Sequence, residues 1–416
     1  MGPIIIFDKS TLQSLSVDEA VWLDVHYSAN ITPLFFVETL ADLEKEVQGG
    51  RTPEQVVGNL AEKTPEEGKP NVHHVTVCVN ELLGAQVEMR GVPVLAGGEQ
   101  VESEGRQAVV FKESPEMAAL SRWQEGRFLE VEREFARVWR NALSGLDLGA
   151  LYGEGRSIIQ RHSRPRDLLE AKALAVALHE KRGSRYTREA LQALPVRADV
   201  HREIAERWRA AGEPPIKQFA PFTAHVVTVD SFFTIALGAD FISRERASNK
   251  VDIAYLYYLP FCMVFTSGDK LHAKTAPLFL GERQRFVSAE ELKGDLAKLD
   301  AHYSALPVEV KQRGVLSFAH YPPTEGEFLT AKMWDELMRP DWRKHAADPG
   351  LKLSKEQEKA LVAQVNRMAD AKRSAQGFTS KEADAVLFQR KVPVWKGKWR
   401  LVPPEAEEGA REHQEG

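Results

Sequence analysis

The feature that most constrains the fold is a pair of short, continuously apolar runs that each end close to an aspartate. The first run covers 3–7 and is followed by Asp8, and the second covers 263–266 and ends near Asp269. Short runs rich in β-branched residues are typical of parallel strands that are buried on both faces. Polar residues just beyond the carboxyl ends of such strands are the usual place for chemistry. The two runs therefore predict an α/β protein with a parallel sheet and a site at one edge of it.

Local signals predict the elements around these strands. Ser16 and Glu19 have the spacing of a capping box, which predicts a helix to about His26. Thr32-Pro33 predicts the start of a second helix, because proline is favoured in the first turn. Strands are also predicted at 71–79, 85–111 and 285–287, and helices at 219–242, 252–262 and 289–302.

The alternation of strands and helices flanks a long stretch of different character. We expect 1–50 and 219–305 to form one discontinuous domain with a Rossmann-like parallel sheet. The segment 51–218 is predicted to be an insertion, with strands followed by helices. The segment 306–403 is predicted to be a helical extension that ends in a hairpin. The last segment, 404–416, contains five Glu and one Arg and is predicted to be a disordered acidic tail.

Composition excludes several classes of protein. With 416 residues, 43% hydrophobic and 28% charged, the chain is too apolar for wholesale disorder. A net charge of −5 argues against a general coat for polyanions, and two cysteines exclude a disulfide framework or a multi-cysteine zinc module. The longest near-apolar stretches are 219–239, which carries Asp230, and 253–268, which is shorter than the roughly 20 residues of a membrane span. We expect a soluble, cytoplasmic protein with no membrane partner.

Four acidic residues lie where they could share one site. Asp8 and Asp269 follow buried strands, Asp252 opens the helix that leads into the second strand, and Glu38 lies in a largely apolar helix. A charge among apolar residues is costly unless it faces a cleft, a metal or a partner. Carboxylates that converge repel one another, and hard divalent cations such as Mg²⁺ or Mn²⁺ relieve that repulsion. The chemistry that fits is metal-assisted attack of water on a phosphodiester.

Each of these carboxylates also has an ordinary structural explanation. Taken alone, Asp8 is also explained as a strand-end turn residue or helix cap, Asp269 as an ordinary turn residue and Asp252 as a helix cap. Glu38 is also explained as a solvated helix residue. Taken together, the four positions favour the ligand role. Asp230 lies within an apolar helix, where it either supports the site or is buried and paired with an Arg.

The order of these residues resembles that of the PIN-domain nucleases. An apolar strand followed by Asp-x-Ser is similar to the first family motif, and a helical Glu after apolar residues is similar to the second. The 17 residues from Asp252 to Asp269 fit the helix-plus-strand unit of the third and fourth motifs. The matching segments are 4–10, 31–40, 252–256 and 264–271.

The resemblance implies a PIN-like sheet whose catalytic residues bind Mg²⁺ or Mn²⁺. The implied catalytic and metal-binding residues are Asp8, Glu38, Asp252 and Asp269. Ser10 and Ser267 would support the site through hydrogen bonds, and Asp230 is a further supporting candidate. The basic residues expected near the substrate phosphate are Arg244, Arg246, Lys250 and Lys270.

Members of the family cleave RNA and, less often, DNA, so the resemblance implies an endoribonuclease with nucleic acid as its partner. The chain departs from the family in the connection between the second and third motifs, where about 213 residues intervene between Glu38 and Asp252. This insertion could recognise substrate, act as a lid or bind a partner protein, and homo-oligomers remain open.

Two other functions compete with the nuclease. A haloacid-dehalogenase-like phosphatase also begins with an apolar strand and Asp, but it needs a second Asp at the position of Ser10. A catalytically silent PIN-like scaffold for RNA binding or assembly needs no intact acidic set.

Overall fold

The computed structural model of the protein describes most of its residues. These are 2–41, 43, 47, 50–66, 68–103, 105–145, 147–347, 355–369, 371, 373–374, 383–388 and 392–404. The predicted acidic tail at 404–416 lies outside the described residues apart from Pro404.

A five-stranded sheet forms the centre of the fold, and all its strand pairs are parallel. The α/β class and the parallel sheet predicted from the sequence are therefore confirmed. The strands, in chain order, are β1 (Ile4–Phe7), β2 (Ser28–Ile31), β3 (Lys69–Pro70), β6 (Val264–Ser267) and β7 (Arg285–Ser288).

The strand order is β3-β2-β1-β6-β7, so the direction of winding reverses beside β1. From β1 the chain builds β2 and β3 on one side and then returns to place β6 and β7 on the other. The register pairs Phe7 with Thr266, which brings the ends of β1 and β6 side by side. In open parallel sheets, ligands bind outside the carboxyl ends of the strands at such a reversal. The reversal therefore marks the edge where a site is expected.

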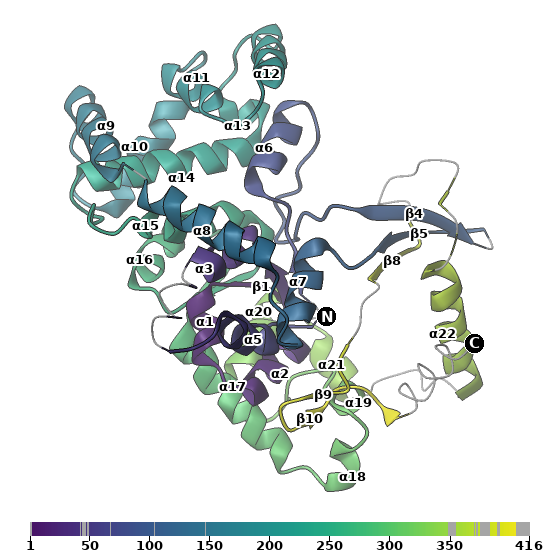
Figure 1. The fold of residues 1–416 in the computed structure, drawn as a ribbon. Coiled ribbons are helices and arrows are strands. Elements are labelled where there is room, and N and C mark those ends of the chain that lie inside the picture. The colour runs from purple at the N-terminus through teal and green to yellow at the C-terminus, as the bar shows by residue number, and fades with distance from the viewer. Residues whose placement is uncertain are drawn as a thin grey trace.

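Burial on both faces explains why β1 and β6 are continuously apolar. Side chains alternate between the faces of a strand. Ile5 and Phe7 accordingly pack into one hydrophobic core with Trp22, whereas Ile6 packs into a second core with Phe265. The first core contains residues of α2 (Val17–His26) and α17 (Ala289–Ser304), and the second those of α14 (Pro221–Gly238) and the 3-10 helix η1 (Tyr255–Phe261). Figure 1 shows α2, α14 and α17 around β1.

Helices follow directly on the strands that matter for the site. Asp8 caps α1 (Lys9–Ser14), and Ser16 with Glu19 forms the predicted capping box of α2. The chain then passes through β2 into α3 (Pro33–Ala41), and later through α5 (Pro53–Lys63) into the short edge strand β3. Residues 51–70 thus contribute a helix and a strand to the sheet domain, and the long insertion begins after residue 70.

The insertion contains one helix, then a β-hairpin, and then further helices. The hairpin strands are β4 (Gly98–Ser103) and β5 (Arg106–Phe111), which are antiparallel. The helices before α14 are α6 (His74–Leu82), α7 (Pro115–Gln124), α8 (Glu130–Ser144), α9 (Leu148–Arg161), α10 (Leu168–His179), α11 (Arg185–Gln192), α12 (Ala198–Ala210) and α13 (Ile216–Phe219). After α14 the chain returns to the sheet domain. The helices there are α15 (Asn249–Ala254), before β6, and α16 (Lys270–Phe279), after β6.

The strand predicted at 71–79 is wrong, because most of this segment belongs to α6. Its valines and threonine favour a strand by local propensity. In the structure Val77, Cys78 and Leu82 are buried, a spacing that points to one face of a helix. Packing of that face against the protein core therefore overrides the local preference.

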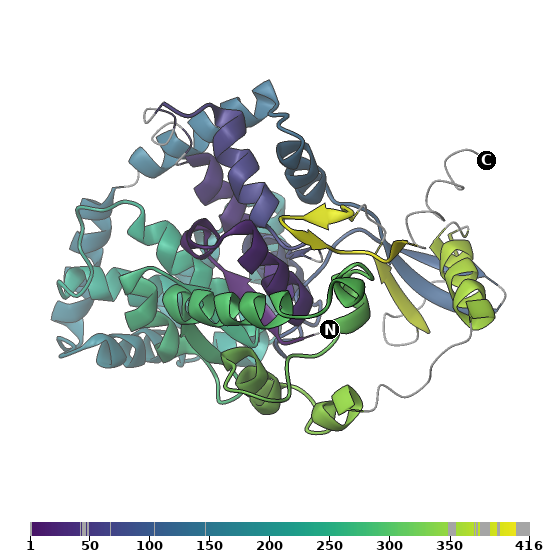
Figure 2. The same cartoon turned by 90° about the horizontal axis from the view of Figure 1, so that it is seen from below.

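The C-terminal extension returns to two distant parts of the chain. Strand β8 (Ala385–Phe388) pairs with β5, and α22 (Lys355–Ala369) contacts β4, so both join the insertion hairpin at one side of the molecule (Figures 1 and 2). The remaining helices are α18 (Val308–Lys311), α19 (Val315–Phe318), α20 (Leu329–Leu337) and α21 (Trp342–Ala347).

The terminal hairpin predicted from the sequence is confirmed. It consists of β9 (Trp395–Lys396) and β10 (Trp399–Arg400), which are antiparallel. Asp300 of α17 ties it to the sheet domain, because its Oδ1 accepts hydrogen bonds from Nε1 of Trp22 (3.2 Å) and of Trp399 (2.8 Å). None of the helices in the described part of the chain has the length and hydrophobicity needed to span a bilayer.

Candidate functional site

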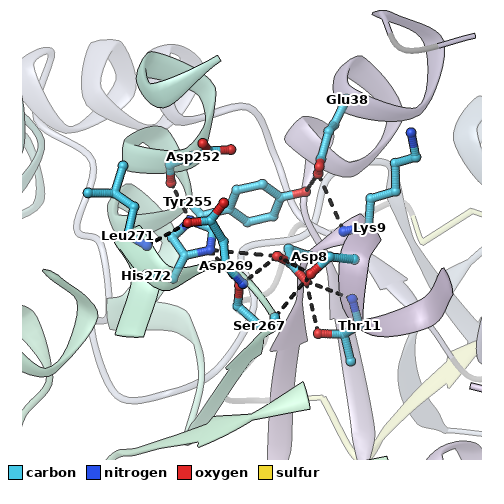
Figure 3. A network of polar contacts seen from close by, with 12 residues as sticks. Asp8, Lys9, Thr11, Glu38, Asp252, Tyr255, Ser267, Asp269, Leu271 and His272 are labelled. Atoms are coloured by element: carbon cyan, nitrogen blue, oxygen red, sulfur yellow. Dashed lines mark hydrogen bonds and ion pairs between the residues drawn. The ribbon is translucent and has the colours of Figure 1, made fainter. Parts of the chain in front are cut away.

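The four acidic residues singled out from the sequence come from four elements that meet at the carboxyl edge of β1 and β6. Asp8 and Asp269 are the N-caps of α1 and α16, while Glu38 lies in α3 and Asp252 in α15. Figure 3 shows the four side chains at this edge of the sheet, with the Tyr255 ring drawn among them. Their charges also act on one another, since Asp8 and Asp252 raise the pKa of Glu38, and Asp269 raises that of Asp252. The structure therefore brings all four together.

Asp8 is surrounded by hydrogen-bond donors. Its Oδ1 accepts from the amide and the hydroxyl of Thr11, both at 2.9 Å, and its Oδ2 accepts from Ser267 Oγ at 2.6 Å and Ser10 Oγ at 2.8 Å. Burial raises the pKa of the carboxyl, but contacts with His272, Ser267 and Thr11 offset this and hold the pKa below its usual value. Asp8 is thus both a helix cap and a fixed negative charge.

His272 belongs to the same network, although the sequence did not single it out. It is 1% exposed, and its Nδ1 lies 2.7 Å from Ser267 Oγ and 3.6 Å from Asp8 Oδ2. Its Nε2 lies 2.6 Å from the carbonyl oxygen of Asp252. Burial lowers the pKa of His272, but Asp8 outweighs that effect and the pKa lies above its usual value. Its position one helical turn after Asp269 is the signal that could have found it.

Glu38 has a different environment. Its Oε2 accepts a hydrogen bond from the Tyr255 hydroxyl at 2.8 Å and a longer one from the Lys9 amide at 3.4 Å. Burial, together with the charges of Asp8 and Asp252, raises its pKa to about 7. Tyr255 is fully buried, and burial and the Glu38 charge raise its pKa, so the hydroxyl keeps its proton and remains a donor. Tyr255 lies one turn after Asp252, and this spacing could have indicated it.

Asp252 is the least compensated of the four carboxylates. Burial raises its pKa to about 7; His272 and Arg246 lower it, while Asp269 and Asp8 raise it. No donor in the described part of the chain forms a hydrogen bond with its side chain. By contrast, the Asp269 carboxylate accepts from the Leu271 amide at 2.5 Å. Two carboxyls of the cluster, Glu38 and Asp252, therefore have pKa values raised toward neutral pH.

Asp230 and Lys250 form a separate polar cluster. The Lys250 ammonium is paired with Asp230, and both contact the Tyr257 hydroxyl. The charge of Asp230 acts on His74 and His179 of the insertion. Both predicted site residues are thus committed to contacts away from Asp8.

Of the other three basic candidates, two lie beside the acidic residues and one contacts a tyrosine of the insertion. Arg246 acts on the pKa of Asp252, and exposed Lys270 follows Asp269 at the start of α16. The Arg244 guanidinium instead stacks over the Tyr152 ring, 4.7 Å from its centroid. Arg246 and Lys270 are therefore the two predicted substrate contacts that the structure leaves beside the acidic edge.

Among the described residues, no group of three or more His, Cys, Asp or Glu side chains is arranged to hold a metal ion as it stands. Comparison with known protein families, with curated proteins and with solved structures finds no match to this chain.

Proposed function

We propose that this protein is a metal-dependent nuclease with a PIN-like catalytic sheet, and that it is an endoribonuclease using Mg²⁺ or Mn²⁺. The observation that carries the proposal is the meeting of Asp8, Glu38, Asp252 and Asp269 at the reversal point of a parallel sheet, with the pKa values of Glu38 and Asp252 raised to about 7. A protein that keeps unneutralised carboxylates together at this edge gains most from a bound cation.

The donor set fits the chemistry of these ions, because it consists of carboxylate oxygens. Mg²⁺ keeps several waters and commonly uses only one or two carboxylates together with substrate phosphate oxygens. The absence of a three-residue metal cage among the described residues is compatible with this coordination by one or two carboxylates. Asp252 and Glu38 would be the first ligands, since Asp8 is already saturated by protein donors.

The other roles in the site fall to residues of the chain itself. Asp8 holds α1 and the Ser267–His272 pair in place, which fixes the edge of the sheet. Asp252, whose side chain accepts no hydrogen bond from a donor within the described residues, keeps its carboxylate oxygens available to the ion. When bound, the ion would supply positive charge and Lewis acidity beside the phosphodiester. Arg246 and Lys270 would contact neighbouring phosphates.

The resemblance to PIN-domain nucleases is the reason for preferring RNA to DNA. The same resemblance leaves the silent scaffold as the competing function. The extensive hydrogen bonding of Asp8 favours that alternative, since a carboxylate fully satisfied by the protein has less need of a metal.

The test is cleavage of end-labelled single-stranded RNA and DNA in Mn²⁺, Mg²⁺ or EDTA. Asp252→Asn keeps the shape of the side chain and removes its charge, and Asp240→Asn is the matched control at an exposed position with positive φ, which Asn tolerates. Metal-dependent cleavage that is lost in Asp252→Asn and kept in Asp240→Asn supports the proposal. No cleavage, together with no effect of Mn²⁺ on the melting temperature, would contradict it and favour the scaffold.

A further inference from the structure

A cavity of about 660 Å³ lies between α1, α3 and α5, next to the acidic edge. Among the described residues, its lining contains three cationic side chains, those of Lys9, Arg51 and Lys63, and no carboxylate. Its rim carries three exposed amides, those of Gln13, Gln55 and Asn59. Pockets of roughly 300–1,000 Å³ are typical of sites for small organic ligands.

The two lysines of the cavity are buried, which is costly for an ammonium group. Lys9 is 3% exposed and Lys63 is 8% exposed. Within the described residues, Lys63 has one hydrogen bond, to the Gln13 carbonyl oxygen at 3.4 Å, which is longer than a normal N–H···O bond. Burial lowers the pKa of Lys63; Lys293 lowers it further, while Glu62 and Glu19 raise it. An anion in the cavity would give the Lys63 ammonium a negatively charged partner, which no described residue supplies by an ion pair.

The rim is suited to a different kind of group. An amide side chain carries both hydrogen-bond donors and an acceptor, which is the combination that the edge of a nucleobase requires. The Gln55 Oε1 already accepts from the Thr52 amide at 2.9 Å, so Gln55 contributes its NH2 donors. Val56 and Leu60 add apolar surface to the same lining. A ligand that combines a charged phosphate with a polar, flat base would therefore use both the floor and the rim.

The cavity continues from the carboxylates. Lys9 follows Asp8 directly, and its amide reaches Glu38, while Thr39 of the lining follows Glu38. Figure 3 shows Lys9 beside Glu38, with its ammonium end pointing away from Asp8. A strand whose phosphodiester lies at the acids would have its next nucleotide within this cavity.

We propose that the cavity binds one nucleotide unit of a nucleic-acid strand, with its phosphate on Lys9, Lys63 and Arg51 and its base on the rim amides. The identification of the strand as a substrate rests on the proposed nuclease function, whereas the binding of a nucleotide does not. A free mononucleotide presents the same chemistry, so the experiment must separate the two sources.

The experiment measures binding by titration calorimetry in EDTA, with the full chain and without metal. The probes are inorganic phosphate, adenosine, adenosine 5′-monophosphate and a short single-stranded oligoadenylate. The variants are Lys63→Met, which removes the buried ammonium, Arg51→Gln on the exposed rim and Asn59→Leu among the amides. Lys217→Met on the exposed surface of α13 is the control.

We expect the monophosphate to bind more tightly than phosphate or adenosine. Lys63→Met and Arg51→Gln should each weaken its binding by about tenfold or more, as expected for loss of one charge-assisted hydrogen bond. Asn59→Leu should weaken binding of the monophosphate but not binding of phosphate. Lys217→Met should change the binding of neither ligand. Tighter binding of the oligoadenylate, in competition with the monophosphate, identifies a strand; equal or weaker binding overturns the strand assignment and identifies a free nucleotide.

The inference is overturned if wild-type protein binds no monophosphate, or if Arg51→Gln and Lys63→Met bind it as tightly as the wild type. Arg51 is exposed, so its variant separates a loss of binding from a loss of folding. Nucleotide binding in a protein that cleaves no nucleic acid would contradict the nuclease alone. Metal-dependent cleavage by a protein that binds no monophosphate would contradict the cavity assignment alone.

Discussion

Replacing Glu38 by Gln in metal-free protein should remove a penalty that grows with pH. The variant keeps an oxygen that can accept the Tyr255 hydroxyl but cannot ionise. The pKa of Glu38 is raised from 4.5 to about 7 by burial and by the charges of Asp8 and Asp252. Below the lower value the group is protonated in both the folded and the unfolded chain. Between the two values only the unfolded chain loses its proton, so the stability of the wild type falls as pH rises.

The magnitude follows from the shift. A difference of about 2.5 pKa units, at about 1.4 kcal/mol each, corresponds to about 3 kcal/mol once both states are ionised. With an unfolding entropy of roughly 2.1 cal/mol/K per residue, that is about 3 °C in melting temperature for 416 residues. Between about pH 5 and pH 8.5, Glu38→Gln should therefore gain about 2–3 kcal/mol relative to the wild type.

The assay is thermal melting across this pH range in EDTA, with Glu309→Gln on the exposed face of α18 as the matched control. Addition of Mn²⁺ should reduce the advantage of Glu38→Gln, because the ion neutralises the carboxylate in the wild type. Melting curves of the wild type and Glu38→Gln that stay parallel at all pH values would refute the reasoning, since Glu38 would then titrate as in the unfolded chain.

Three further changes test other parts of the structure. Asp252→Asn should also stabilise metal-free protein at high pH, as measured by thermal melting in EDTA. The double variant with Glu38→Gln should gain less stability than the sum of the two single variants, because the Asp252 charge is one cause of the raised Glu38 pKa. Gly155→Ala should cost about 1–3 kcal/mol in denaturant unfolding, because its Cβ would lie 2.1 Å from a carbonyl oxygen of α14, whereas Gly153→Ala in the same helix meets no atom within 4 Å and should cost nothing. Asp300→Ala should cost about 1–3 kcal/mol, because it leaves two indole N–H groups without their acceptor, and should speed proteolysis of the terminal hairpin.

The parts of the fold that could be predicted are those whose cause is local. The run before Asp8 is apolar on both faces because the strand is covered on both faces, and the Ser16–Glu19 capping box forms between neighbouring residues. The helix at α6 was missed because tertiary burial, which the sequence does not display, decided against local propensity. Strand β3 was missed because it has two residues, one of them a proline that only an edge strand tolerates.

The same distinction between local and tertiary causes applies to the site. The carboxylates could be predicted because each follows or faces a recognisable strand or helix. The spacing of His272 and Tyr255, one turn after Asp269 and Asp252, could have placed them near the site, but their hydrogen-bond partners depend on which side chains lie opposite them after folding. The cavity was invisible for the same reason, since Lys9 and Lys63 come together only when α1 packs on α5.

The distribution of compensated and uncompensated charge explains why two ligands belong at this edge. Asp8 receives its hydrogen bonds from the protein, which therefore stabilises that charge without help. Glu38 and Asp252 repel their neighbours, and on the other side of the Lys9–Glu38 contact the Lys63 ammonium is buried with one long hydrogen bond in the described structure. A cation alone would neutralise the negative charge of Glu38 and Asp252. A phosphate alone would neutralise the positive charge of Lys63. A nucleic-acid strand carrying both phosphate and metal would relieve both at once, so this edge is better matched to a metal-bound polyanion than to either component by itself.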